Sequence, residues 1–337
     1  MRKPFRSAFL AGLAVLALTS AGCSSAAPAG TDDASDSDSP EELTSVTYLT
    51  SFNTFGRDAY AFVALEKGFF EDAGFDVEIQ PGSGTVDVLK LVASGKADFG
   101  VGDFQAAALT IANEQIPVRI VSAIQDKSLA AIATAEGYGV SEPKDLEGKK
   151  IADQPGSVNE VLFPVYAEAA GIDASKVTFV PAQPSALPQL LASRQVDAIG
   201  QFVVADGLIR GATGKAGVFL PFSDYLDDLY GNALFASEER AADDPDSIAR
   251  FNEALHEGLE YAIENPEEAG EILAKYQPTQ KADVAAGEIT AMTPYVGDAT
   301  SNGVLDPARV DAILALLFDG GAIKAEPDAS TIVAPVK

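Results

Sequence analysis

Aromatic and polar side chains gather in the segments expected to follow strands, and together they could bind a ligand. The aromatic residues are Phe52, Phe55, Tyr60, Phe104, Phe202 and Tyr225. The residues that could hydrogen-bond to a ligand or approach it closely are Asn53, Arg57, Asp103, Gln105, Gln125, Gly156, Ser157, Asn159 and Gln201. Flat aromatic faces with a few hydrogen-bonding groups suit a heteroaromatic ring. We predict that these residues form a binding site, with the alternative that about half of the aromatic rings belong to the core.

Asp103 and Phe104 follow the predicted strand ADFGVG (97–102). In that strand Phe99 and Val101 alternate toward the interior, and Gly102 ends the strand pairing. We therefore predict that Phe104 stacks on the ligand ring and that Asp103 accepts a hydrogen bond from a ring amine. The alternative is that Asp103 only caps the next helix and that Phe104 only seals its first turn.

The sequence offers little for catalysis or metal binding. It contains one histidine, His256, one cysteine, Cys23, and neither an HExxH nor a GxSxG motif. His256 lies in the acidic segment FNEALHEGLEYA, and we interpret it as a solvated or half-buried helix residue. We predict a binding protein with no catalytic residue, no metal ligand and no cofactor. Paired carboxylates that hydrolyse a substrate are the alternative, because 50 residues are acidic.

The N-terminal residues resemble a bacterial export signal. Arg2, Lys3 and Arg6 precede an apolar run (8–18) and the small residues LTSAGC, so residues 1–22 are predicted to be a signal peptide. Cys23 follows at the position where bacterial lipoproteins are acylated. Residues 23–44 are predicted to be a lipidated cysteine followed by a disordered acidic tether. The tether is expected to be disordered because the segment lacks apolar periodicity. We expect an exported protein anchored to the outer face of the cell membrane.

The chain is strongly acidic, with a formal net charge of −27. Such a surface repels nucleic acid and anionic lipid, so neither is expected as a direct partner. No run after Cys23 is long and apolar enough to span a bilayer. We expect a monomer whose only attachment to the membrane is the lipid on Cys23.

Strand and helix patterns alternate through the body, which predicts an α/β fold with mostly parallel sheets flanked by helices. Strands are expected at 45–50, 75–79, 97–102, 117–124, 149–153, 177–182 and 196–202. Helices are expected at 59–74, 85–95, 104–114, 158–170 and 187–194, and the segment after 237 is mainly helical. Residues 45–130 and 232–337 are predicted to form one lobe and residues 131–231 the other, with the ligand cleft between them.

The two halves share an internal echo. LVASGKAD (91–98) and LLASRQVD (190–197) match at an offset of 99 residues, each with the end of an apolar helix followed by an aspartate at the start of a strand. The echo predicts two similar lobes. In open α/β sheets ligands bind at the carboxyl ends of the strands, so two facing lobes would enclose a cleft.

Four segments in order resemble a known family. They are VALEKGFFEDAGFDVEI (63–79), LVASGKADFGVGDFQ (91–105), PVRIVSAIQDKSLAAIAT (117–134) and PKDLEGKKIADQPGS (143–157). Their order and spacing are similar to those of the solute-binding proteins for nitrate, alkylsulfonates, taurine and thiamine-pyrimidine precursors. The resemblance covers residues 45–325. It implies a clamp of the periplasmic binding protein type that closes on a ligand and delivers it to an ABC permease with a cytoplasmic ATPase. Fungal pyrimidine-synthesis enzymes look similar, so an enzyme on the same scaffold is the alternative from another class.

The ligand expected on this basis is a thiamine-pyrimidine precursor. Arg57 is one cation in the predicted loops, but Asp58 and Asp103 lie in the same set, so a neutral or cationic aminopyrimidine suits them better than an anion. Riboflavin, another flat ring, is the next candidate, followed by sulfonate, taurine or nitrate. Stacking residues serve a pyrimidine and a flavin equally, so the sequence leaves that choice open.

Overall fold

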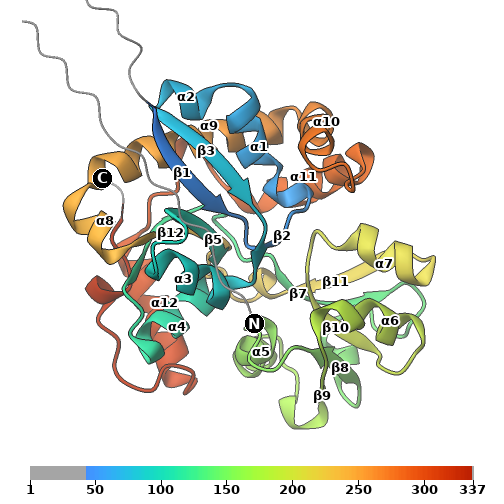
Figure 1. The fold of residues 1–337 in the computed structure, drawn as a ribbon. Helices are drawn as coiled ribbons and strands as arrows, with labels where there is room; N and C mark the ends of the chain where they lie inside the picture. The colour runs from blue at the N-terminus through green and yellow to red at the C-terminus, as the bar shows by residue number, and fades with distance from the viewer. Residues whose placement is uncertain (1–42, 336–337) are drawn as a thin grey trace, which may run out of the picture. The chain divides into compact units, whose positions relative to one another are not determined.

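The structure is a computed structural model that describes residues 43–335, all of which belong to one compact unit (Figure 1). The predicted signal peptide, Cys23 and most of the predicted tether lie outside the described residues. Within the described part of the chain, no helix is both long and apolar enough to cross a membrane.

The fold contains two five-stranded sheets, and we call each sheet with its helices a lobe. The first sheet has the order β3-β1-β5-β12-β6. Its strands are β1 (Thr44–Leu49), β3 (Phe75–Gln80), β5 (Phe99–Asp103), β6 (Val118–Ala123) and β12 (Asn232–Ser237). The second sheet has the order β11-β7-β10-β8-β9. Its strands are β7 (Ala130–Ala135), β8 (Lys150–Asp153), β9 (Thr178–Pro181), β10 (Ala198–Phe202) and β11 (Gly217–Pro221).

Both sheets are mostly parallel, as predicted, but each contains one strand, β12 or β7, that runs against the other four. In the first sheet β1 pairs in parallel with β3 and β5, whereas β12 runs antiparallel to β5 and β6. In the second sheet β8 pairs in parallel with β9 and β10, whereas β7 runs antiparallel to β10 and β11. β7 is the first strand after the chain crosses into the second sheet, and β12 is the first strand after the chain returns to the first sheet. The direction of these two antiparallel strands therefore depends on long-range connections.

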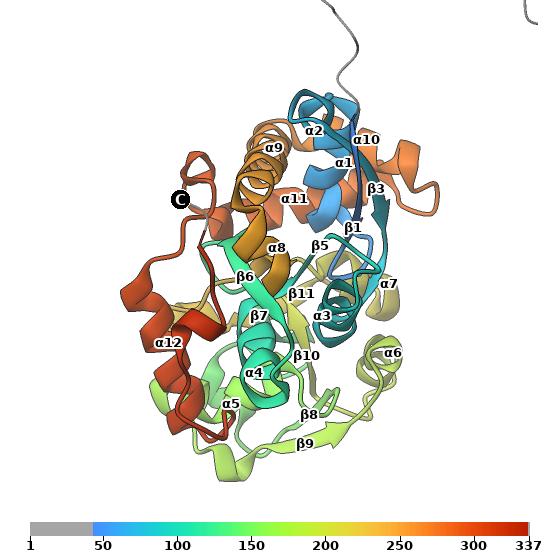
Figure 2. The ribbon, with the colours of Figure 1, turned by 60° about the vertical axis from the view of Figure 1, so that its left-hand side comes forward.

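Helices cover both faces of the sheets (Figures 1 and 2). In the first lobe they are α1 (Ala59–Glu66), α2 (Phe69–Asp72), α3 (Thr85–Ala93), α4 (Phe104–Glu114), α8 (Glu238–Asp243), α9 (Pro245–Glu264), α10 (Pro266–Tyr276), α11 (Ala282–Val296) and α12 (Pro307–Asp319). In the second lobe they are α5 (Val158–Ala169), α6 (Leu187–Ala192) and α7 (Asp206–Thr213). The helix predicted over 59–74 is two helices, because Gly68 adopts a left-handed backbone with φ of 82° between them.

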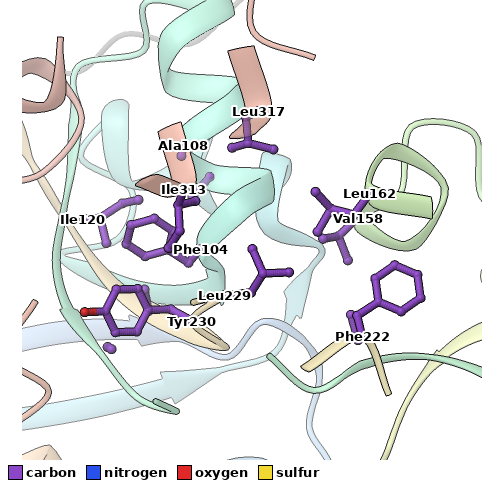
Figure 3. Packing of buried hydrophobic residues seen from close by; sticks show 14 of the residues in the cluster. Phe104, Ala108, Ile120, Val158, Leu162, Phe222, Leu229, Tyr230, Ile313 and Leu317 are labelled. Carbon is purple, nitrogen blue, oxygen red and sulfur yellow. The ribbon is translucent and has the colours of Figure 1, made fainter. Parts of the chain in front are cut away.

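An aromatic cluster fixes one face of the first sheet. Phe251 of α9 stacks on Phe99 of β5 with ring centroids 4.1 Å apart, and on Phe70 of α2 at 5.0 Å. All three rings are fully buried. Phe251 therefore anchors α9 to that face, since large buried aromatic rings contribute strongly to the stability of a core. The opposite face packs on α3, α4 and α12, as the cluster around Phe104 shows (Figure 3).

The internal echo corresponds to equivalent positions in the two sheets. Read from β3 and from β9, the sheets have the same strand order and the same strand directions. Asp98 precedes β5 and accepts a hydrogen bond from the Thr47 backbone N–H at 2.9 Å, and Asp197 precedes β10 and accepts one from Lys150 at 2.9 Å. The two aspartates therefore fasten equivalent neighbouring strands, which explains why the sequence repeats there.

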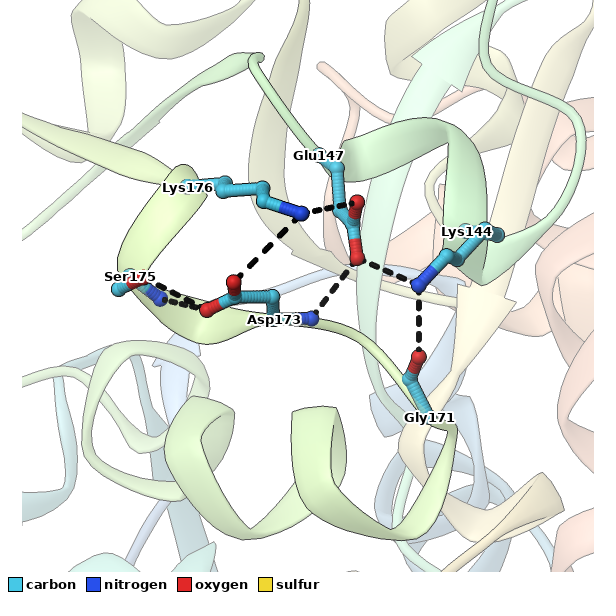
Figure 4. A network of polar contacts seen from close by, with 6 residues as sticks. All are labelled: Lys144, Glu147, Gly171, Asp173, Ser175 and Lys176. Carbon is cyan, nitrogen blue, oxygen red and sulfur yellow. Dashed lines mark hydrogen bonds and ion pairs between the residues drawn. The ribbon is translucent and has the colours of Figure 1, made fainter.

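A surface network of charges holds the outer loops of the second lobe together (Figure 4). Glu147 receives hydrogen bonds from Lys144 at 2.5 Å, Lys176 at 3.1 Å and the Asp173 backbone at 3.0 Å. These bonds lower the pKa of Glu147 to about 2. Because water surrounds the exposed Lys144 and Lys176 side chains and screens their charges, the network orders loops more than it stabilises the fold.

Candidate functional site

Arg57 joins the two lobes. It lies in a short 3-10 helix (Gly56–Asp58) before α1, and its side chain is 8% exposed. The centre of its guanidinium group is 5.3 Å from the ring centroid of Phe55 in the first lobe and 5.3 Å from that of Phe202 at the end of β10. Both distances fall within the range of cation–π attraction. Three predicted site residues, from segments far apart in sequence, therefore meet at one place.

Two carboxyl groups lie near Arg57. Asp58 is 1% exposed, and its Oδ2 atom accepts a hydrogen bond from the Phe55 backbone at 2.9 Å. Burial raises the pKa of Asp58 to about 6, although the positive charge of Arg57 opposes this. Glu288 of α11 accepts a hydrogen bond from the Gly56 backbone at 2.7 Å, and burial raises its pKa as well. Gly56 permits this approach, because a Cβ atom there would lie 2.5 Å from the Ala285 carbonyl oxygen.

The second lobe contributes a third buried carboxyl group at the end of β8. Asp153 is 6% exposed, and burial raises its pKa to about 6. Its Oδ2 atom accepts a hydrogen bond from the Ser157 hydroxyl at 2.5 Å, and its Oδ1 atom accepts one from the Gln154 backbone at 2.7 Å. Ser157 also caps α5 by accepting a bond from the Glu160 backbone at 3.1 Å. The contacts place Asp153 and the start of α5 in one polar cluster.

Several buried polar atoms in these loops lack a hydrogen-bonding partner. Within the described residues, Thr54 Oγ1, Asp58 Oδ1 and Asn159 Oδ1 are buried and unpartnered. Each such atom costs about 1–3 kcal/mol when buried without a partner. The first two follow β1 and the third opens α5, so both lobes present free hydrogen-bonding groups in the loops that were predicted to bind a ligand.

Tyr60 and Phe104 lie in the core of the first lobe, which corrects the prediction that they face the ligand. Tyr60 is 1% exposed in α1, with its hydroxyl 3.2 Å from that of Tyr48. Phe104 is fully buried and packs on Tyr230, with ring centroids 5.2 Å apart, among Ile120 and Ile313 (Figure 3). The alternation argument fails for Phe104 because β5 is covered by helices on both faces, and all five of its residues are buried.

Asp103, Gln105 and Gln125 are also bonded within the first lobe. Asp103 caps α4 by accepting a hydrogen bond from the Ala106 backbone at 2.8 Å, and burial raises its pKa to about 7. Gln105 donates to the Tyr230 carbonyl at 2.9 Å, and Gln125 accepts from the Asn232 backbone at 2.7 Å. The geometry therefore favours the capping role of Asp103 over the ligand role.

The remaining predicted residues lie on or near the surface of the loops. Phe52 and Asn53 are exposed, and they form β2 (Phe52–Asn53), which pairs with β4 (Gly82–Ser83). Gly156 is exposed, whereas Gln201 is half-buried and accepts a hydrogen bond from Asn159 through its carbonyl at 3.4 Å. Tyr225 is 42% exposed and contacts Tyr166 edge-on, with centroids 5.7 Å apart.

His256 is buried in α9, which corrects its interpretation as a solvated or half-buried residue. It is 2% exposed, with Nδ1 2.9 Å from the Asn252 carbonyl and Nε2 3.1 Å from the Ala123 carbonyl. Burial lowers its pKa. Two surface hollows, one beside His256 and one beside Arg240, are lined by none of the predicted ligand residues. Among residues 43–335, no group of three or more His, Cys, Asp or Glu side chains is arranged to hold a metal ion.

Sequence reasoning did not select Asp58 and Glu288 near Arg57, nor Thr54 and Asp153 in the loops after β1 and β8. Asp153 ends the predicted strand KKIAD, so its position at a carboxyl end was a usable signal. Asp58 adjoins Arg57 in the first predicted loop. Glu288 comes from a helix 232 residues after Gly56, and no local pattern could have placed it there.

The capping interpretation of Asp103 and Phe104 predicts a specific pair of results. Asp103→Asn should leave ligand affinity unchanged, because asparagine also caps helices. Phe104→Ala should lower the free energy of unfolding by about 3–5 kcal/mol, because it leaves a cavity in the core. Urea unfolding and a binding titration of both variants check this. A tenfold loss of affinity in Asp103→Asn, with unchanged stability, would instead assign Asp103 to the ligand.

Comparisons with known proteins agree with this architecture. The profile of the NMT1/THI5-like family matches residues 58–269, which is more than half of the chain. The chain is 24% identical over 238 residues to the formylaminopyrimidine-binding protein of Halalkalibacterium halodurans, covering 70% of this chain and 72% of that protein. It is 22% identical over 279 residues to the 4-amino-5-hydroxymethyl-2-methylpyrimidine phosphate synthase of Candida albicans, covering 79% and 81%.

A solved structure shares the fold. The alkanesulfonate-binding protein of Xanthomonas axonopodis pv. citri superposes with a TM-score of 0.69 at 16% identity, covering 87% of this chain and 99% of that one. At this identity the likeness concerns the fold alone, and it supports a two-lobed α/β architecture. With the family profile spanning parts of both lobes, the chain belongs to the NMT1/THI5-like family.

Proposed function

We propose that the protein is the extracytoplasmic solute-binding component of an ABC importer and that it captures a small flat heteroaromatic ligand. The observation that carries the proposal is the convergence of Phe55, Arg57 and Phe202 from two lobes, with unpartnered polar atoms beside them. Ligand sites combine aromatic walls with a few placed polar groups in this way. A relative named as a formylaminopyrimidine-binding protein supports the same class of ligand.

The preferred ligand is an aminopyrimidine that serves as a thiamine precursor. Asp58 Oδ1 and Asn159 Oδ1 are acceptors without donors, and ring amines would supply the missing N–H groups. The sequence predicted that Asp103 accepts a hydrogen bond from the ring amine. We now assign that acceptor role to Asp58 and Asn159. Riboflavin is the second candidate, and a sulfonate, taurine or nitrate is the third.

A pyrimidine-synthesis enzyme is the candidate from another class, supported by the Candida albicans relative. The only histidine, His256, is buried in α9, where its ring nitrogens lie near two backbone carbonyls. Neither carbonyl belongs to Phe55, Arg57 or Phe202. We therefore favour binding without turnover. Incubation with excess ligand followed by product analysis separates the two functions, because only an enzyme forms product.

Lobe closure is the proposed mode of capture. We propose lobe boundaries at 45–130 with 232–337, and at 131–231, so that the chain crosses between lobes twice. Arg309 of α12 bonds to both crossings, through Asp126 Oδ1 at 2.6 Å and the Asp228 carbonyl at 2.6 Å. Because Phe202 contacts Arg57, the lobes must separate around this point to admit a ligand.

A thermal-shift screen tests the proposed function. Residues 43–337 would be mixed with aminopyrimidines, riboflavin, taurine, aliphatic sulfonates and nitrate. A true ligand raises the melting temperature progressively with the logarithm of its concentration, because it binds the native state. Stabilisation by an aminopyrimidine alone supports the preferred ligand. Stabilisation by none of the compounds would contradict the proposal.

Export and anchoring complete the proposal. We propose that Cys23 carries the lipid that holds the protein at the outer face of the cell membrane as a monomer, where a permease and its cytoplasmic ATPase receive the ligand. Cys23→Ala should move most of the protein from the membrane fraction to the soluble fraction, because lipid chains supply the membrane affinity. Fractionation with immunoblotting measures this. Equal membrane retention of both forms would refute the anchor.

A further inference from the structure

The Arg57 guanidinium has hydrogen-bonding capacity that the described chain does not use. Among residues 43–335 it forms no ion pair and donates no side-chain hydrogen bond, although it is only 8% exposed. The half-buried arginine Arg309, in contrast, bonds to Asp126. A guanidinium group carries five N–H donors in one plane, and burying them without acceptors is costly. Its guanidinium group instead lies beside the rings of Phe55 and Phe202.

The surroundings of Arg57 decide what kind of acceptor suits it. Asp58 and Glu288 lie close enough to interact with its charge, although neither forms an ion pair with it. Two carboxyl groups beside one guanidinium group already supply negative charge. A ligand that brought a further full negative charge would be repelled by them. A neutral oxygen with lone pairs in the plane of its group meets no such repulsion.

From this geometry we infer that Arg57 determines specificity by donating hydrogen bonds to a neutral carbonyl oxygen on the ligand. The inference rests on the proposed function and narrows it to flat heterocycles that carry an amide, formyl or ring carbonyl. The aromatic rings of Phe55 and Phe202 would lie beside the same group, one from each lobe. A carbonyl oxygen at this point would thus contact the first lobe while the second lobe closes over it.

A matched pair of probes tests the inference by calorimetric titration. The probes are 4-amino-5-aminomethyl-2-methylpyrimidine and its N-formyl derivative, which differ in the carbonyl group and in the charge of the amine. The wild-type protein should bind the N-formyl compound at least about 30-fold more tightly, since hydrogen bonds to charged groups contribute about 1.5–3 kcal/mol. In Arg57→Met this preference should vanish, because the donors and the positive charge are both gone. The affinity for the amine should stay the same or rise.

Two further variants make the result interpretable. Arg57→Lys keeps the charge but loses the planar arrangement of donors, so it should lose at least about tenfold affinity for the N-formyl compound. Arg194→Met is the matched control, because Arg194 also lies over an aromatic ring, that of Tyr138, but is exposed and outside the cluster. It should bind both probes as the wild type does. Circular dichroism confirms that each variant is folded.

The outcomes separate this inference from the proposed function. If Arg57→Met and Arg57→Lys bind the N-formyl compound as tightly as the wild type, the inference is wrong and the binding function stands. If taurine or nitrate binds most tightly and depends on Arg57, the neutral carbonyl is wrong. If riboflavin binds instead and depends on Arg57, the inference stands and the aminopyrimidine is wrong. If no probe binds, both are overturned.

Discussion

Gly200→Ala is expected to reduce ligand affinity by about 10- to 100-fold while the chain remains folded. Gly200 lies in β10 beside Asp153 of β8, since Ile199 and Ala152 are paired neighbours in the same sheet. A Cβ atom on Gly200 would overlap the Asp153 carboxyl group. The carboxyl group must move, and its bonds to the Ser157 hydroxyl and the Gln154 backbone would break. The loss of a charged hydrogen-bonding group at the proposed site should cost about 1.5–3 kcal/mol of binding.

The accompanying loss of stability should be modest. Overpacking of a strand by one methyl group costs about 1–3 kcal/mol, which a chain of this size tolerates. Gly211→Ala in α7 is the matched control, because a Cβ atom there meets open space. That variant should bind normally and be slightly more stable, since alanine favours a helix over glycine by about 1 kcal/mol. Normal ligand affinity in folded Gly200→Ala would remove Asp153 from the site.

The second large effect is a loss of stability between pH 4 and pH 7. Burial raises the pKa of Asp58 and Asp153 to about 6 and that of Asp103 to about 7. The native state therefore binds protons that the unfolded state has already released, so stability falls as the pH rises through this window. A shift of about two units corresponds to roughly 3 kcal/mol for one carboxyl group, as an upper bound.

The titration of His256 makes stability rise with pH, but it does not outweigh the fall caused by the buried aspartates. Burial lowers its pKa, so its contribution to stability rises as the pH passes through the ordinary value of 6.5. One histidine opposes three buried aspartates, and the net charge of −27 adds repulsion at higher pH. Urea unfolding at pH 5.0 and 7.5 measures the slope. Asp103→Asn should flatten it, because asparagine caps α4 without titrating. Equal or greater stability at pH 7.5 in the wild type would contradict this expectation.

The elements were largely predictable because their patterns are local. Helix α4 covers the predicted residues 104–114, where an aspartate cap precedes an apolar stretch. Strands β7, β11 and β12 and helix α7 were not among the predicted elements. The direction of β7 and β12 was also beyond the sequence, because their partners depend on chain crossings rather than on side-chain alternation.

The candidate site was predictable in part for a similar reason. Loops at the carboxyl ends of strands could be located, so Phe55, Arg57 and Phe202 were identified before their contact was known. Phe104 was misplaced because alternation indicates a free face only when one face of a strand is solvated, and β5 is buried on both. The role of Glu288 depends on how α11 packs against the loop at Gly56, which no local pattern encodes.

One measurement tests the central claim most directly, namely that the protein binds a flat heteroaromatic solute and releases it unchanged. The protein would be titrated with the N-formyl aminopyrimidine in a calorimeter, and the ligand would then be recovered from the complex and identified by mass spectrometry. We expect one ligand per chain, a dissociation constant of about 1 μM or tighter, and recovery of the ligand with its mass unaltered. Absence of binding, or recovery of a converted product, would contradict it.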